Sequence, residues 1–419
     1  MSQSQPLPRP LEGITVLDLT TALAGPFATL ILAGLGARII KIENPKSGDA
    51  CRSNSPYLGE SGGKLVRDNE DDISISAINR LRNKLGITLN LKHPDAPGIF
   101  ADLLKQADVV VENFSSGVMN RLGIGYDFGK QINPKIVYCS INGFGNDNQI
   151  KEPSSGKAMD TIIQALSGVM QTSGEPDDPP LRLGVPFADL VTPLFGIIGL
   201  LAALQQRQNT GLGQHVDVSM LGVMTSLVAC EPFDLLELLG IPTKTGQTAP
   251  RLAPFGVYQA SDGYIALCAH TEGFARGLFK AMERPELIAD ERFSTRDSRV
   301  KHVKEIDALV SEWMGSLTQK EILARLEIVG VPSAEVRNPQ DAVRDPLVVS
   351  RGETVPLEHP KFGAVEDVYG IGMPIRFSGA TAGFDQPPPE MGEHNALIYG
   401  QMLGYSESKI QELKASDAI

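Results

Sequence analysis

One carboxylate stands out because of its apolar surroundings. Asp189 follows the apolar stretch 183–188 and precedes the apolar helix candidate 194–204. A partly desolvated carboxylate at the start of a helix is a usable nucleophile toward an activated acyl group. Asp is also a common N-cap, and Asp189 could accept backbone N–H bonds from the helix that begins near Leu190. Both interpretations stay open, and they are compatible.

Other catalytic chemistries lack their motifs in this sequence. GxSxG, HExxH and a P-loop are absent, and the four cysteines are scattered without CxxC spacing. The glycine turn at Gly25-Pro26 lacks the GxGxxG pattern of nicotinamide and flavin enzymes. His93 and His394 are interpreted as structural or capping groups. The sequence therefore predicts neither a metal site nor a permanently bound cofactor.

The net charge of the chain limits the kinds of molecule that it can bind. The formal net charge is −12, so the electrostatic term would oppose nucleic-acid binding. An anionic small ligand is still compatible, because local cations and helix N-termini govern a site more than net charge does. The candidate cations are Lys41, Arg82, Lys84, Arg121, Lys157 and Arg182.

The sequence also bears on location. Residues 1–13 are polar and proline-rich, without the pattern of a signal or transit peptide. The longest apolar run, 193–204, is shorter than the roughly 20 residues of a membrane-spanning helix. Scattered cysteines are typical of a reducing compartment. We therefore expect a cytoplasmic protein without a membrane partner.

Alternating strand and helix patterns dominate the first part of the chain. Buried strands are expected at 13–19, 38–45, 84–91, 107–114 and 135–143, with helices between them. A long surface loop with one short helix is expected at 47–78. Such β-α repeats predict an α/β doubly wound parallel sheet whose ligands bind at the carboxyl ends of the strands. Ala24, Asn113 and Gly143 lie just past such ends.

The second part of the chain indicates a smaller domain. Two helices separated by the loop 173–184 occupy 157–208, and a turn, strand and helix follow. We predict a large domain beginning with residues 1–225, a Gly/Pro-rich linker at 226–256 and a small α+β domain at 257–330. Residues 330–338 are expected to be a return strand, so that 331–419 completes the large domain.

Five blocks together resemble the family III CoA-transferases of the CaiB/BaiF type, in particular the formyl-CoA:oxalate enzymes. They are LEGITVLDLTTALAGPFATLILAGLGARIIKIENP, ENFSSGVMNRLG, QALSGVMQTSGEPDDPPLRLGVPFADLV, TGLGQHVDVSML and MGEHN. The resemblance covers nearly the whole chain. It implies a Rossmann-like large domain, an interlocked homodimer of ring-shaped chains, and coenzyme A as a substrate carried between an acyl-CoA and a carboxylic acid.

The same resemblance implies roles for single residues. Asp189 takes the place of the catalytic nucleophile, and Lys157 and Asp160 flank the approach to it. The predicted CoA-binding residues are Leu23, Ala24, Asn44, Leu89 to Lys92, Asn113, Phe114, Arg121, Lys157 and Asp160. The implied reaction passes through a mixed anhydride and a thioester, both formed on the aspartyl carboxyl group.

Three departures from the oxalate enzymes bear on the substrate. Leu23 stands where they carry glutamine, Met159 stands where they carry tyrosine, and their glycine-rich loop is reduced to residues 245–251. The loss of polar groups favours an acyl chain larger or less polar than formyl or oxalyl, with succinyl-CoA as the expected donor.

Two alternative functions stay open. One is an α-methylacyl-CoA racemase, although Met159 replaces its histidine, and the other is a non-catalytic CoA-binding protein.

Overall fold

The computed structural model describes residues 7–146 and 157–419. Contacts divide the chain into two compact units. The first consists of the described residues up to Ser167, Leu183–Val228 and Val343–Ile419, and the second of Gly168–Arg182 and Ala229–Ala342. Each unit has its own hydrophobic core. The domain boundaries expected at 225, 256 and 330 stay a prediction.

A six-stranded parallel sheet forms the centre of the first unit. Its order is β6-β2-β1-β7-β8-β9, and all neighbouring strands are parallel. The strands are β1 (Thr15–Asp18), β2 (Arg38–Glu43), β6 (Lys84–Thr88), β7 (Val109–Glu112), β8 (Val137–Asn142) and β9 (His215–Ser219). The order reverses between β1 and β7, the point at which doubly wound sheets bind ligands. The predicted parallel sheet is confirmed.

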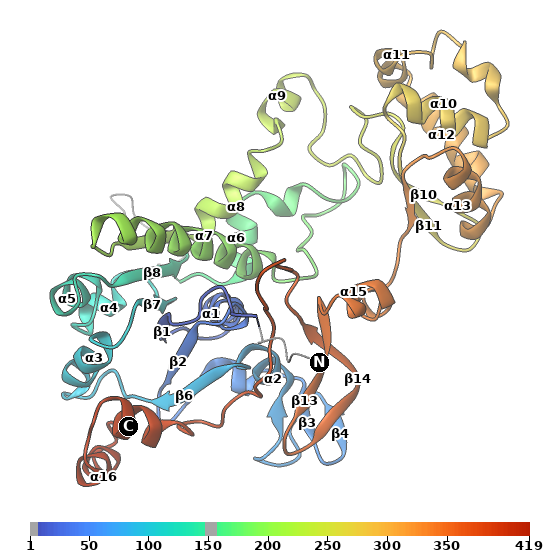
Figure 1. The fold of residues 1–419 in the computed structure, drawn as a ribbon. Helices are drawn as coiled ribbons and strands as arrows, with labels where there is room; N and C mark the ends of the chain where they lie inside the picture. The colour runs from blue at the N-terminus through green and yellow to red at the C-terminus, as the bar shows by residue number, and fades with distance from the viewer. Residues whose placement is uncertain (1–6, 147–156) are drawn as a thin grey trace. The chain divides into compact units, whose positions relative to one another are not determined.

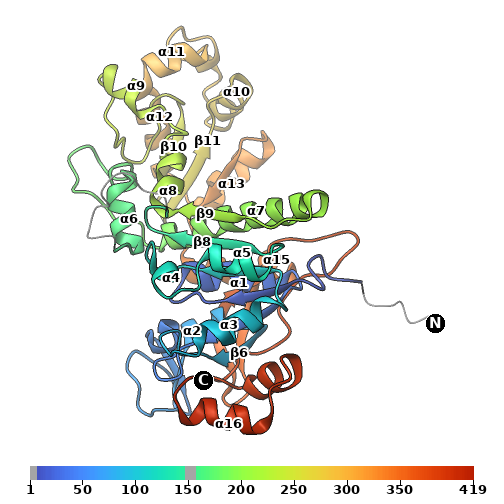
Figure 2. The same cartoon turned by 90° about the vertical axis from the view of Figure 1, so that its left-hand side faces the viewer.

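Helices cover both faces of this sheet (Figure 1, Figure 2). On one face, α1 (Ala24–Gly34) and α7 (Phe187–Thr210) pack on a core that includes Val16 and Val111. On the other face lies a core that includes Leu17 and Val110. Its helices are α3 (Ala96–Leu104), α5 (Tyr126–Ile132) and α16 (Glu407–Ala415). Because successive strand residues point to opposite faces, a run of apolar residues is needed to fill both cores.

The segment 47–78 contains short helical elements, as expected, but it also contains strands that were not predicted. It contains η1 (Ala50–Ser53) and a three-stranded antiparallel sheet of order β4-β3-β5. The strands are β3 (Tyr57–Gly59), β4 (Gly62–Lys64) and β5 (Ile73–Ser74). Strands this short have no detectable period-two pattern. Ser74 then caps α2 (Ile75–Arg80) by accepting a bond from the Ser76 N–H.

The expected pair of helices around the 173–184 loop is confirmed as α6 (Asp160–Leu166) and α7, with the short η3 (Val169–Gln171) between them. α7 has 24 residues, is longer than the apolar run suggested, and includes Pro193. By length and composition alone it could cross a membrane. Its inner side, however, packs against the sheet, as a core helix does.

The second unit is built on a small antiparallel sheet. Its order is β10-β11-β12, formed by β10 (Phe255–Gln259), β11 (Tyr264–Cys268) and β12 (Ser333–Glu335). The helical elements are α9 (Phe233–Leu238), α10 (Glu272–Ala281), η4 (Pro285–Ile288), α11 (Arg296–Lys301), α12 (Val303–Gly315) and α13 (Gln319–Ile328). β12 was expected to return to the large domain but pairs with β11. An apolar strand pattern identifies a strand without identifying its partner.

The remaining elements include the short helices α4 (Val118–Arg121), α8 (Met220–Val228), α14 (Pro339–Val343) and α15 (Pro346–Ser350). A hairpin of β13 (Thr354–His359) and β14 (Gly363–Ile371) follows, and then the π-helical η5 (Ala396–Met402). The MGEHN block lies along β6, where Gly86 N–H donates to His394 Nδ1 at 3.2 Å and Thr88 N–H to Asn395 Oδ1 at 2.9 Å. His394 is therefore a structural group, as expected.

Candidate active site

Two cavities of the first unit lie where the chain leaves β1 and β7. The smaller, about 200 Å³, contains Asp189, and the larger is about 400 Å³. Thr21 and Phe114 line both. The smaller is lined by Thr21, Ala22, Leu23, Ala24, Asn113, Phe114, Ser115, Ile141, Asn142, Gly143, Ala158, Met159, Asp189 and Met220. An elongated ligand could therefore occupy the larger cavity with one end at Asp189.

Asp189 lies in the first turn of α7 with a half-buried side chain. Burial, and to a lesser extent the nearby Asp160 carboxylate, raise its pKa to about 6, while the Arg80 guanidinium acts in the opposite direction. Within the described residues its carboxylate accepts no hydrogen bond. A carboxylate that is short of water and has no donor is available for attack on a ligand.

Asp160 performs the capping role that was considered for Asp189. The N-cap position of α7 is Pro186, which has no side-chain acceptor, so the N-cap interpretation of Asp189 was wrong. Asp160 Oδ1 instead accepts bonds from the N–H groups of Ala188 at 2.9 Å and Asp189 at 3.5 Å. Its Oδ2 accepts from Gln164 Nε2 at 2.7 Å. Asp160 is thus the residue that caps α7, and among residues 7–146 and 157–419 no group donates to the Asp189 side chain.

The turn after β1 forms another wall of the smaller cavity. Ala22 has a positive φ of 68°, a conformation that costs a non-glycine residue about 1 kcal/mol. Asn113 holds the turn, since Thr21 N–H donates to its Oδ1 at 2.8 Å and its Nδ2 donates to Thr21 O at 2.9 Å. Asp49 Oδ1 accepts from Ala22 N–H at 2.9 Å. These bonds place Leu23 and Ala24 beside Asp189.

A network of buried charged side chains packs against the turn after β1. Lys41 Nζ lies 2.8 Å from Asp49 Oδ2, and Lys84 Nζ lies 3.0 Å from Asp18 Oδ2. Burial alone would raise the pKa of Asp18, but the ammonium groups of Lys41 and Lys84 hold it well below its usual range. Both lysines were candidates for binding an anionic ligand. Their ammonium groups are fully buried and paired, so they are structural instead.

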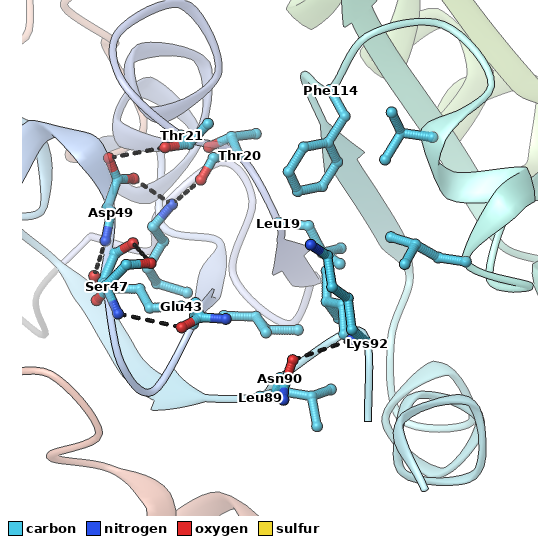
Figure 3. Close-up of a pocket in the computed structure, with 17 residues that line it drawn as sticks. Leu19, Thr20, Thr21, Glu43, Ser47, Asp49, Leu89, Asn90, Lys92 and Phe114 are labelled. Carbon is cyan, nitrogen blue, oxygen red and sulfur yellow. Dashed lines mark hydrogen bonds and ion pairs between the residues drawn. The ribbon is translucent and has the colours of Figure 1, made fainter. Parts of the chain in front are cut away.

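The larger cavity is lined by part of the predicted CoA-binding set. Asn44, Leu89, Lys92 and Phe114 all line it. Figure 3 shows Phe114 and Lys92 on the side opposite Thr20, Thr21 and Asp49. Asn44 Oδ1 accepts bonds from the N–H groups of Lys46 and Ser47, which fixes the turn after β2. An apolar wall with an exposed lysine at its edge suits a long ligand that carries an anionic end.

Three predicted residues line neither cavity: Asp160, which caps α7, and the two exposed cations Arg121 and Lys157. Arg121, at the end of α4, is exposed, and its Nη1 donates to Ser116 O at 3.4 Å. Lys157 is also exposed and directly precedes Ala158 and Met159 of the smaller cavity. Their roles in binding stay predictions.

Sequence reasoning missed Arg80. Arg80 Nη1 donates to Ala22 O at 3.1 Å, and its charge acts on Asp189. Because residues 47–78 were expected to be mainly a surface loop, nothing in the sequence placed Arg80 near Asp189. The neighbouring candidate Arg82 is committed to structure, since Nη2 donates to Asn79 Oδ1 at 2.9 Å and to Ile371 O at 2.6 Å.

Known proteins resemble this chain in sequence and in fold. A succinate–glutarate CoA-transferase of Agrobacterium fabrum is 32% identical over 94% of this chain and 96% of its own length. A formyl-CoA:oxalate CoA-transferase of Streptomyces avermitilis is 32% identical over 98% and 99%. The crystal structure of a CaiB/BaiF family protein from Brucella suis superposes with a TM-score of 0.77, at 32% identity, over 94% of this chain and all of that one. The model of CoA-transferase family III matches residues 11–395, and the chain therefore belongs to this family of CoA-transferases.

Proposed function

We propose that this protein transfers CoA from succinyl-CoA to a carboxylic acid larger than oxalate, with Asp189 as the nucleophile. One observation carries the proposal. The unbonded Asp189 carboxylate lines a small cavity that shares Thr21 and Phe114 with a larger cavity suited to an elongated ligand. A thioester at the junction would face the carboxylate at one end and hold its CoA portion at the other.

The proposed reaction has four displacements at carbonyl carbons. The Asp189 carboxylate attacks the donor thioester, and the C–S bond breaks to give a mixed anhydride and the CoA thiolate. The thiolate then attacks the aspartyl carbonyl, which releases the donor acid and leaves an aspartyl-CoA thioester. The acceptor carboxylate attacks this thioester, and the released thiolate attacks the acceptor carbonyl, forming the new acyl-CoA and freeing Asp189.

The environment of Asp189 suits a nucleophile at neutral pH. With a pKa of about 6, the carboxyl group is roughly nine-tenths ionised at pH 7. Its raised basicity makes the ionised form a better nucleophile than an ordinary carboxylate. The apolar Leu23 and Ala24 side chains give this cavity an apolar wall, and such a wall disfavours water that would hydrolyse the anhydride.

The cavity wall also supports the choice of substrate. Relatives named for succinate and glutarate and for formyl-CoA and oxalate are equally identical to this chain, so identity alone does not select a substrate. Leu23 and Met159 both line the cavity and offer no hydrogen-bond donor to a small polar acyl group. Apolar walls favour an acyl group with a methylene chain.

The test is incubation of the protein with succinyl-CoA and glutarate, with the acyl-CoA products identified by mass spectrometry. Glutaryl-CoA should form with the wild type, and Asp189→Ala should reduce the rate by at least about 10⁴-fold while still binding CoA.

A second test traps the intermediate. Borohydride added to the reacting enzyme should reduce the aspartyl-CoA thioester and so convert the Asp189 side chain to an alcohol. Activity of Asp189→Ala within tenfold of wild type would refute the nucleophile. Racemisation of a 2-methylacyl-CoA without transfer would refute the reaction class.

A further inference from the structure

Helix α2 places the Arg80 guanidinium next to a residue of the smaller cavity wall. Ser74 caps this helix, and Ala77 and Ile78 are fully buried, so the helix is firmly anchored. Arg80 is its last residue. The guanidinium Nη1 donates to the carbonyl of Ala22 at 3.1 Å, and Ala22 lines the same cavity as Asp189. Arg80 therefore has a definite position next to the site of acyl transfer.

Arg80 is also the cation that the cavity otherwise lacks. The residues that line the smaller cavity in the described part of the chain include no lysine, arginine or histidine. Burial lowers the pKa of Arg80, while Cys51, Asp49 and Asp189 act in the opposite direction. An arginine keeps its charge under these conditions. The partly buried Arg80 guanidinium is thus close enough to act electrostatically on Asp189 in a cavity whose described lining has no cation.

Most of the hydrogen-bonding capacity of Arg80 is unused. A guanidinium has five N–H donors, and within residues 7–146 and 157–419 Arg80 donates to Ala22 O and pairs with no carboxylate. Arg52 provides a contrast, because its Nε and Nη2 donate to the two Glu43 oxygens at 2.7 Å each. A partly desolvated arginine without a carboxylate gains most from an anionic ligand that can accept two bonds.

Building on the proposed transfer reaction, we infer that Arg80 binds the remote carboxylate of a dicarboxylic acyl group while its other end reacts at Asp189. The substrates are then dicarboxylic acids and their mono-CoA thioesters. Arg80 sets this preference because a monocarboxylic acyl chain would leave the guanidinium desolvated and unpaired. The contact with Ala22 O orients the guanidinium, so the remaining donors present a planar edge to the ligand.

The experiment is self-exchange, in which each acyl-CoA exchanges with its own isotopically labelled acid. Succinyl-CoA with succinate is compared with butyryl-CoA and butyrate, which have the same chain length without the remote carboxylate. Arg80→Met should lower kcat/KM for succinyl-CoA about 100-fold or more and leave that for butyryl-CoA within about threefold. Arg80→Lys, which keeps the charge but loses the planar fork, should lose about tenfold on succinyl-CoA alone.

Arg38→Met is the matched control. Arg38 is exposed at the amino end of β2, away from the carboxyl ends of the strands, and the substitution removes the same charge. Both exchange rates should be unchanged.

The possible outcomes separate the two proposals. Equal losses on both substrates in Arg80→Met would mean that Arg80 only holds the Ala22 turn, and no loss on either would mean that it does not contact the acyl group. Either result overturns the inference. If the wild type exchanges neither acid, the proposed transfer reaction itself fails. Should Arg80→Met not fold, as judged by thermal unfolding, the Arg80→Lys comparison decides by the same criterion.

Discussion

Asp189 and Asp160 are neighbouring acids with different tasks, and their hydrogen bonds account for the difference. Asp160 accepts bonds from backbone N–H groups of α7 and from Gln164, whereas Asp189 accepts none within the described residues. Donors stabilise the ionised form of a carboxylate, and burial without donors destabilises it. Two neighbouring carboxylates, one from α6 and one from α7, can therefore differ in role, with Asp160 as a cap and Asp189 as the proposed nucleophile.

The raised pKa of Asp189 predicts the pH dependence of transfer. Only the ionised carboxylate attacks, so kcat/KM should rise about tenfold per pH unit below pH 6 and level off above about pH 7. Initial rates from pH 4.5 to 8.5 with saturating acceptor would measure this rise, the acid limb of the rate profile. A midpoint near the ordinary aspartate value of 3.8 would contradict the assigned environment.

The raised pKa of Asp189 also predicts that ionisation of this residue lowers the stability of the folded protein. The folded pKa lies above the unfolded value of 3.8, so the folded state holds this proton more tightly. Rising pH between about 4 and 6 therefore removes stability, and the loss is complete above that range. Asp189→Asn should be more stable than wild type at pH 8 by about 1–3 kcal/mol, with no difference near pH 4. Chemical denaturation at both pH values is the measurement, and an equal effect at both would refute this origin.

At the scale of elements, the start of α7 depends on a residue from α6. Asp160→Ala removes the acceptor for Ala188 N–H and should destabilise the protein by about 1–2 kcal/mol. Asp160→Asn keeps an acceptor but removes the charge, so it should largely preserve stability. Both variants should move the acid limb of the rate profile to lower pH, because the like charge that raises the Asp189 pKa is gone. An unmoved limb in Asp160→Asn would show that burial alone sets that pKa.

At the scale of the whole molecule, one side of α7 carries exposed apolar residues. Leu194, Ile198 and Leu201 lie at three- and four-residue spacing, and Ile198 is 63% exposed in the single chain. A contiguous apolar stripe of this kind marks an interaction surface. We propose that it is covered by a second copy of the chain, in keeping with the homodimer that the family resemblance implied.

This proposal gives a direct test. Ile198→Asp should shift the sedimentation profile from dimer to monomer, because it buries a charge in an apolar contact. Gln208→Asp, at the C-terminal end of the same helix, serves as the control and should leave the profile unchanged. A wild type that sediments as a monomer at micromolar concentration would refute the proposal.

The sequence by itself determined the central sheet and pointed to Asp189 as the candidate nucleophile. Strands buried on both faces are mainly apolar, so β1, β2, β6, β7 and β8 were visible as runs. The carboxyl ends of β1 and β7 placed Ala24 and Asn113 near one another. Asp189 was visible because a charge between apolar segments is rare. Both signals are local and depend on residues within about one helix or strand length.

Only the tertiary structure decided which charges are available to a ligand. Lys41 and Lys84 are paired with Asp49 and Asp18, and Asp160 caps a helix that begins 27 residues later, at Phe187. Arg80 reaches Ala22 across 58 residues of sequence, through a helix that follows strands too short to be recognised. Charges in a sequence carry no information about their partners, because pairing depends on contacts that form only when distant segments pack together.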